Sequence, residues 1–281
     1  MGHREGWKLV HERDRRKTKR YTMRHEVYPD SFFYMDMTED PVRCSLQELK
    51  EDYARMEKEW AESACWADLQ RVIMSLCRSR SCDSGGGITV DRCVLFGLGS
   101  PSGRSDRKPD PCEEDRRWNS LMQLAIFVSV GKLIASCQQD DEPQTLFAQE
   151  PRFNDLDREF LQSLGIKTVE HPEGFNLLTH NSFAYCPGAE QNVDLRCFSQ
   201  DPVLYLGGDA KTWYDDEGNL RSRFESTKPP GYCEEWDLHP DRDRRCAILV
   251  RSFMRDRQEH ALPELDRSIP IYLNWRQNTE P

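Results

Sequence analysis

The sequence lacks the segments that would place a chain in a membrane or send it through one. It contains no unbroken run of about eighteen apolar residues, so a membrane-spanning helix is not expected. The first residues, MGHREGWKLVHERD, contain no apolar core of a signal peptide. We therefore expect a cytoplasmic protein that is also present in the nucleus and has no membrane partner.

Paired metal-ligand motifs are also missing. The chain has 11 cysteines but no CxxC pair, and structural zinc sites use such closely spaced pairs. The nearest neighbours in sequence are Cys77 with Cys82 and Cys186 with Cys197. Most cysteines stand in apolar stretches, as Cys93 does, which is typical of buried thiols. We expect reduced cysteines and no bound metal.

Positive charges are outnumbered over the whole chain, 39 Lys and Arg against 49 Asp and Glu, but they predominate at its start. The formal net charge is −10, and an acidic surface repels a phosphate backbone, so general nucleic-acid binding is not expected. Residues 1–25 nevertheless carry nine Lys and Arg against three Asp and Glu. This basic segment is either a solvated tail or a contact for nuclear import or an anionic partner. A protein partner would use this tail or the acidic surface of the remainder.

Residues 45–77 predict an amphipathic helical segment. Ser45 and Glu48 have the spacing of a capping box, in which each side chain accepts a backbone N–H at the helix start. The apolar residues that follow, at alternating steps of three and four, are Leu46, Leu49, Tyr53, Met56 and Trp60. We expect this stripe to pack on the chain's own core, with a partner-binding helix as the alternative.

Beyond residue 90, short apolar runs alternate with helical patterns. The predicted strands are residues 93–98, 145–148, 167–170, 182–185 and 203–206, with helices at 118–137 and 155–164 between them. Residues 101–117 predict a flexible insertion, and 247–250 and 269–273 predict further strands. This alternation predicts an α/β fold: a Rossmann-like, mainly parallel sheet flanked by helices, with strand 93–98 near its middle.

The same patterns divide the chain into four parts. They predict a basic, flexible tail over residues 1–40 and a helical segment packed on the core over 41–90. The Rossmann-like core takes up residues 91–210, and a loop-rich C-terminal extension with extra strands takes up 211–281. Of these parts, only the core has the strand and helix alternation of a ligand-binding α/β domain.

Three segments together resemble the Sensitivity-to-Red-light-Reduced family. They are VLFGLGS at residues 94–100 with Gln123-Leu124-Ala125, QEPRF at 149–153 with Asp157, Leu164-Gly165 and Glu173-Gly174, and SFAYCP at 182–187. The resemblance covers about residues 90–208 and implies a Rossmann-like fold and a regulatory role, associated in plants with light and clock signalling. It implies no single reaction.

Two positions depart from the family pattern. Glu150 stands where family members usually carry Asp, which keeps the acid. Gly188-Ala189 stands where they typically carry a His-Cys pair, so any metal binding or chemistry of that pair is lost here.

The candidate ligand-binding residues lie where the predicted strands end, because open parallel sheets bind ligands beyond those ends. They are Gly97, Gly99, Ser100, Glu150, Glu173, Tyr185 and Asp209. The glycine turn offers N–H groups to an anionic or polar ligand, and Glu150 stands where nucleotide-binding folds place an acid for ribose hydroxyls. GLGS lacks the third glycine of the dinucleotide fingerprint, so the sequence names no cofactor. The alternative is that these glycines and acids belong only to the scaffold.

Two classes of function remain from the sequence. One is a regulatory or interaction protein that senses a small polar ligand at the strand ends. The other is a small-molecule enzyme of the transferase or cyclase type that uses the same pocket. The sequence assigns no catalytic residue.

Overall fold

The computed structural model describes residues 20–22, 32–34, 42, 44–78, 87–103, 113–138, 145–187, 191–209, 240–255, 257–263 and 271–276. The chain divides into two compact units, residues 1–38 with 210–252 and residues 39–209 with 253–281. The smaller unit contains the antiparallel pair β1 (Arg20–Thr22) and β2 (Phe32–Tyr34) and most of α8 (Pro240–Arg255). The segment expected to be a tail therefore includes a two-stranded sheet, whereas its basic run at residues 13–19 lies outside the described residues.

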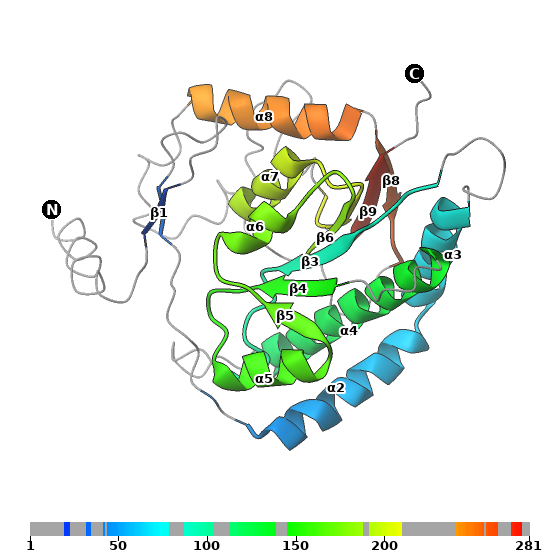
Figure 1. Ribbon diagram of the computed structural model, residues 1–281, viewed down its shortest axis with the longest axis vertical. Helices are drawn as coiled ribbons and strands as arrows, with labels where there is room; N and C mark the ends of the chain where they lie inside the picture. Colours follow the sequence, from blue (N-terminus) through cyan, green and yellow to red (C-terminus); the bar gives the residue numbers. More distant parts are fainter. Residues whose placement is uncertain are drawn as a thin grey trace, which may run out of the picture. The chain divides into compact units, whose positions relative to one another are not determined.

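Seven strands of the larger unit form one sheet in the order β5-β4-β3-β6-β7-β9-β8 (Figure 1). The five parallel strands are β3 (Arg92–Phe96), β4 (Thr145–Gln149), β5 (Ile166–Thr168), β6 (Ser182–Cys186) and β7 (Leu204–Gly207). Strand β9 (Tyr272–Arg276) lies antiparallel between β7 and β8 (Arg257–Ala261). The predicted α/β fold with a mainly parallel, Rossmann-like sheet is confirmed, and β3 stands at the centre of its parallel part.

Helices cover both faces of this sheet (Figure 1). On one face lie α2 (Leu46–Ala61), α3 (Ala64–Arg78), α4 (Glu113–Gln138) and α5 (Asp155–Ser163), which share a core with the inward side chains of the strands. On the other face lie α6 (Glu173–Leu177) and α7 (Gln191–Gln200). Strands β6 and β7 are buried along their whole length, which is why they appear in the sequence as continuous apolar runs.

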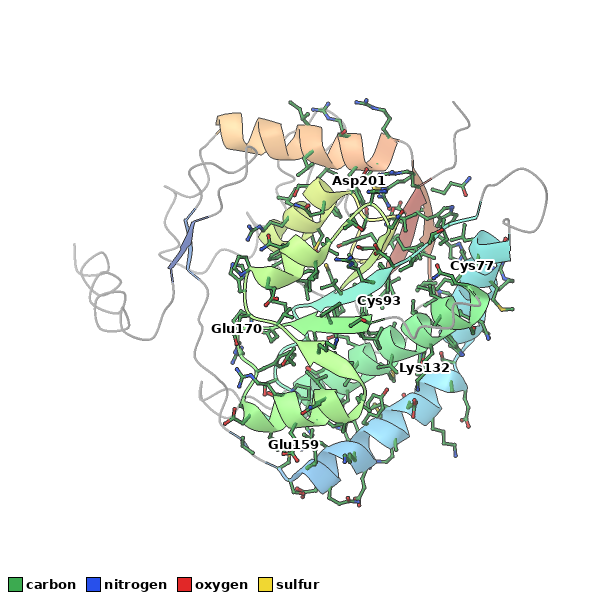
Figure 2. All side chains as sticks on the ribbon, in the orientation of Figure 1. Cys77, Cys93, Lys132, Glu159, Glu170 and Asp201 are labelled. Carbon is green, nitrogen blue, oxygen red and sulfur yellow. The ribbon has the colours of Figure 1, made fainter. Side chains whose placement is uncertain are left out.

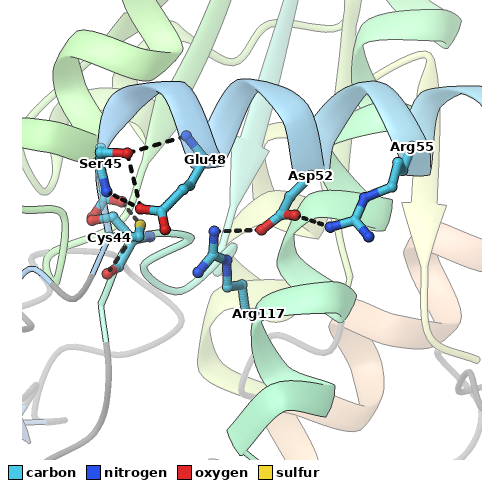
Figure 3. Close-up of polar contacts among 8 residues, drawn as sticks. Cys44, Ser45, Glu48, Asp52, Arg55 and Arg117 are labelled. Atoms are coloured by element: carbon cyan, nitrogen blue, oxygen red, sulfur yellow. Dashed lines mark hydrogen bonds and ion pairs between the residues drawn. The ribbon is translucent and has the colours of Figure 1, made fainter.

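The start of α2 confirms the predicted capping box (Figure 3). The N–H of Ser45 donates to Glu48 Oε2 at 2.7 Å, and the N–H of Glu48 donates to Ser45 Oγ at 3.2 Å. One turn further on, Asp52 pairs with Arg55 of α2 and with Arg117 of α4. The helical segment therefore packs on its own core, as predicted, and an ion pair fastens α2 to α4.

Helix α4 is long and apolar enough over residues 117–138 to cross a membrane. More than half of that stretch is buried inside the protein, however, and it packs against α2 and α3. Leu121, Leu124 and Phe127 are completely buried in the core. Its apolar character is therefore that of a core helix.

Three details differ from the sequence-based expectations. Residues 247–250, predicted as a strand, lie inside α8, because a short apolar run fits one turn of a buried helix equally well. Helix α4 begins at Glu113, so the end of the expected insertion at 101–117 is helical, while residues 104–112 lie outside the described residues. Strand β8 was not predicted, because its sequence RQEHA is polar and has no apolar alternation.

An ion-pair cluster joins the last two strands to the segment before β7. Asp201, labelled in Figure 2, pairs with Arg257 of β8 and with Arg276 of β9. The Arg257 side chain is buried and also lies over the Phe253 ring at 3.9 Å. This cluster lies at the amino ends of the parallel strands, away from the predicted ligand edge.

Candidate functional site

The loop after β3, residues 97–103, follows the central strand and is tied by hydrogen bonds to Glu150, α4 and α5. Gly97 and Gly99 have φ angles of 70° and 71°, a region that L side chains rarely adopt. The N–H of Gly99 donates to Glu150 Oε2 at 3.1 Å, and Ser120 Oγ of α4 donates to the Leu98 carbonyl at 2.7 Å. A Cβ on Gly99 would meet only Ser120 Oγ, at 3.5 Å, so the backbone angle rather than space calls for glycine here.

A buried network, here named the brace (Ser100, Ser102, Asn154 and Asp157), ties this loop to α5. Ser100 Oγ donates to Asp157 Oδ2 at 2.5 Å, and the N–H of Ser102 donates to Asp157 Oδ1 at 2.9 Å. Asn154 Nδ2 donates to Ser102 Oγ at 2.8 Å. All four residues are buried, so every one of these hydrogen bonds is shielded from water.

The brace is built on the N-terminus of α5. Asn154 caps this helix: its Oδ1 accepts the N–H of Asp157 at 3.0 Å, and Asp157 Oδ2 accepts the N–H of Asn154 at 3.1 Å. Burial raises the pKa of Asp157, while the hydrogen bonds from Ser100, Ser102 and Asn154 act against that shift. The two residues of the capping box thus also bind the β3 loop through hydrogen bonds.

A second polar group lies where β4 and β5 end, on the α6 side of the sheet. The N–H of Gly174 donates to Gln149 Oε1 at 2.8 Å, which fixes the orientation of this amide. Gln149 Nε2 therefore faces His171 Nδ1 at 3.3 Å as the donor. Since Nδ1 accepts, a neutral His171 carries its proton on Nε2. Burial, together with the charge of Arg196, lowers the pKa of His171 to about 4, so the ring is neutral at physiological pH.

An aromatic column connects this group to the central strand. The Arg196 guanidinium of α7 lies over the Phe175 ring at 4.6 Å, and Phe175 stacks on Phe96 at 4.6 Å between ring centres. The His171 ring meets the edge of Phe175 at 5.7 Å. Phe96 is the last residue of β3 and directly precedes Gly97. Two aromatic rings, Phe175 and Phe96, therefore separate Arg196 from the start of the glycine loop.

Two cysteines meet on the α7 side, the thiol pair (Cys186 and Cys197). Their sulfur atoms are 3.4 Å apart, and both side chains are buried. Beside them, the Tyr205 hydroxyl donates to Asp194 Oδ1 at 2.9 Å. Burial raises the pKa of Cys186 well above the ordinary thiol value, so it stays protonated and is a poor nucleophile. Across the described residues, no group of three or more His, Cys, Asp and Glu side chains is arranged to hold a metal ion.

The structure brings some of the predicted ligand-binding residues together and separates others. Gly97, Gly99, Ser100 and Glu150 lie at one place, around the β3 loop. Tyr185 is fully buried in the core on the α4 face of the sheet, with its ring stacked near Phe127 at 6.4 Å. Glu173 is exposed in the first turn of α6, and Asp209 is partly buried two residues beyond β7. Ligand binding at these residues stays a prediction.

Sequence reasoning did not single out Gln149, His171 and Arg196. Gln149 is the last residue of β4 and directly precedes Glu150. Side chains alternate between the two faces along a strand, and this alternation places Gln149 on the α6 face, opposite to Glu150. His171 and Arg196 stand in polar stretches without a recognisable motif. Only the fold brings both side chains into contact with the Phe175 ring.

Comparisons with known proteins gave one family match and solved structures of low similarity. A structure that resembles this one is the SAH-bound methyltransferase PaMTH1 of Podospora anserina, 11% identical with a TM-score of 0.33, covering 85% of this chain and 91% of that one. Another is the human methyltransferase 10 domain containing protein, 11% identical with a TM-score of 0.36, covering 84% of this chain and 99% of that one. At these identities the likeness concerns the fold alone.

No curated protein matches the chain at the sequence level. The family model of the SRR1 domain, in contrast, matches residues 67–266. This match contains α4 to β8 in full, with the β3 loop, the brace and the aromatic column inside it. Since it spans more than half of the sequence, the chain belongs to the SRR1 domain family.

Proposed function

We propose that this SRR1-domain protein is a regulatory protein that senses a small polar ligand beyond the carboxyl ends of β3 and β4. The observation that carries the proposal is the β3 loop, which hydrogen bonds to Glu150 and Asp157 tie to the ends of β4 and α5. The strand order reverses direction between β3 and β6, because β4 and β5 lie to one side of β3 and β6 and β7 to the other. Ligands of open α/β sheets bind beside such a switch point, and the β3 loop borders it.

The preformed loop favours binding. A segment that is already ordered loses little conformational entropy when a ligand contacts it. Gly97 and Gly99 have no side chain to keep a ligand away from the backbone. The hydrogen bonds that join Ser100 and Ser102 of the loop to Asp157 are buried, so they support the loop from its inner side.

Glu150 defines the kind of ligand that fits beside the loop. Its carboxylate is partly buried and accepts the N–H groups of Gly99 and Arg152, the latter at 3.1 Å. A phosphate placed at the Gly99 N–H would meet this negative charge at close range, which is unfavourable. A ligand with hydroxyl or amino groups would instead donate to the carboxylate. We therefore expect a polar ligand with donors at this end.

The protonation states of the described groups favour regulation over catalysis. The Cys186 thiol is protonated, and Asp157 is committed to the brace. His171 is neutral, with Nδ1 accepting from Gln149. We further propose that the protein acts in the cytoplasm and nucleus, with a protein partner that contacts the basic residues 1–25 or the acidic surface. Ligand binding at the loop would alter the surface that this partner meets.

The test is a thermal-shift screen of nucleosides, sugars and amines on the purified chain, because a bound ligand stabilises the folded state by mass action. For each stabilising compound, Glu150→Gln should weaken binding about tenfold to a hundredfold, as expected when an acceptor loses its charge. Glu159→Gln is the matched control, since Glu159 is exposed on α5 (Figure 2). Unchanged affinity in a stably folded Glu150→Gln protein would show that this acid belongs to the scaffold.

A further inference from the structure

Arg196 is a half-buried cation with an unusual environment. In an acidic chain with 49 Asp and Glu residues, none of the described carboxylates pairs with it. Its described close neighbour is the Phe175 ring below the guanidinium. Burial lowers the pKa of Arg196, and the nearby Cys197 offsets only a part of that shift.

Such a cation is costly to keep without a partner. Removing part of the hydration of a charge is unfavourable unless a counter-charge replaces it. The cation–π contact with Phe175 returns only a part of that cost, because such contacts are modest where water still reaches the cation. An anion from outside the chain would supply the missing part.

The geometry also suits a planar acceptor. The Cζ atom of Arg196 lies over the Phe175 ring, and Phe96 and His171 pack against this ring. A stacked guanidinium keeps its edge N–H groups in a fixed fork that matches the two oxygens of a carboxylate or phosphate. Because His171 is neutral and uses Nδ1 to accept from Gln149, it neither repels nor replaces the cation.

We propose that Arg196, seated on Phe175, binds an oxyanion group of the ligand at the carboxyl edge of the sheet. This deepens the proposed function and rests on it, because the aromatic column ends at Phe96, directly before the β3 loop. Glu150 and Arg196 then divide the recognition between them. The first selects hydroxyl or amino donors, and the second selects an acidic group. The ligand class is a small polar molecule that carries donors at one end and one phosphate or carboxylate at the other.

The experiment measures the melting temperature of the full chain against inorganic phosphate and, separately, against succinate, with ionic strength held constant by sodium chloride. At least one of the two oxyanions should raise the melting temperature with increasing concentration. Arg196→Gln should weaken that response about tenfold to a hundredfold in anion concentration, because it removes a charged hydrogen-bond donor. Arg196→Lys, which keeps the charge without the fork, should retain part of it.

Arg255→Gln is the matched control, because Arg255 is exposed near the end of α8. It should respond as the unaltered chain does. A response to phosphate alone identifies a phosphate site, and a response to succinate alone identifies a carboxylate site. Equal responses of the unaltered chain and a folded Arg196→Gln variant would overturn the proposal, as would no response to either oxyanion.

The two proposals fail in different ways. If Glu150→Gln leaves the affinity of a screened ligand unchanged, the donor-selecting site is wrong. If Arg196→Gln leaves the oxyanion response unchanged, the oxyanion site is wrong. Circular dichroism of each variant confirms that the compared proteins are folded.

Discussion

Replacing Asp157 with alanine should lower the free energy of unfolding by about 3–5 kcal/mol, because it removes the acceptor at the centre of the brace. Asp157 is fully buried and accepts from Ser100 Oγ and from the N–H groups of Ser102 and Asn154. Alanine would leave these donors without a partner, and each buried unsatisfied donor costs about 1–3 kcal/mol. Against a total stability of about 5–15 kcal/mol, this loss is large.

Asp157→Asn separates charge from shape. If the amide oxygen takes the place of Oδ2, it keeps the contacts with Ser100 and Asn154, but its NH₂ then faces the Ser102 N–H. The Ser102 N–H loses its acceptor and the new N–H finds none, but the other two contacts remain, so we expect a loss of at least about 1–3 kcal/mol that is still smaller than for alanine. The exposed Asp155, in the same helical turn, is the matched control, and Asp155→Asn should change stability by about 1 kcal/mol or less.

Equilibrium unfolding in urea, followed by circular dichroism, measures these differences. The midpoint should fall in the order Asp155→Asn, Asp157→Asn, Asp157→Ala, with a constant slope, because the surface exposed on unfolding hardly changes. If Asp157→Ala lies within about 0.5 kcal/mol of the unaltered chain, as ordinary surface substitutions do, the brace does not hold the loop.

Three more outcomes follow from the described contacts. The pKa of His171 falls from the ordinary 6.5 to about 4 on folding, so between these two pH values the unfolded state binds the proton more readily than the folded state. The free energy of unfolding should therefore fall by about 3 kcal/mol as the pH falls from 6.5 to 4. In urea unfolding measured over a series of pH values, His171→Gln should abolish this part of the pH dependence. The thiol pair should react with a thiol reagent only after denaturation, because burial keeps the Cys186 sulfur protonated and covered; rapid labelling of the native chain would contradict this. Gly207→Ala should cost about 1–3 kcal/mol, since its Cβ would overlap the buried Tyr205 side chain, whereas Gly208→Ala, with nothing within 4 Å of its Cβ, should be nearly neutral in the same urea assay.

Much of the architecture could be predicted because local signals and tertiary packing agree. Ser45 and Glu48 form the predicted capping box, and the continuous apolar runs at β3, β6 and β7 are buried on both faces. The edge strand β8 and the helix α8 before it were harder to predict. Residues 247–250 form part of α8 rather than a strand, and the polar β8 owes its place to pairing with β9 and to the Arg257–Asp201 ion pair.

The candidate site could be predicted only to the edge of the sheet. The predicted ends of β3 and β4 correctly indicated that the β3 loop and Glu150 are neighbours, because adjacent parallel strands end at the same edge of the sheet. They could not show that Tyr185 faces the α4 core, since a strand buried on both faces gives no alternation by which to assign a side. His171 and Arg196 escaped notice because their meeting at Phe175 depends on how α6 and α7 cross the sheet.

The insertion of β9 between β7 and β8 imposes an order on biosynthesis. Strand β8 leaves the ribosome before β9 but, in the described sheet, is joined to the other strands only through it. Until residues 272–276 have emerged, the hydrogen-bonding edge of β7 is uncovered, and an uncovered edge is a template for pairing with another chain. A frameshift or stop codon shortly before Tyr272 would therefore remove β9 from the chain and leave β8 without its partner strand, and the resulting protein would be prone to aggregate.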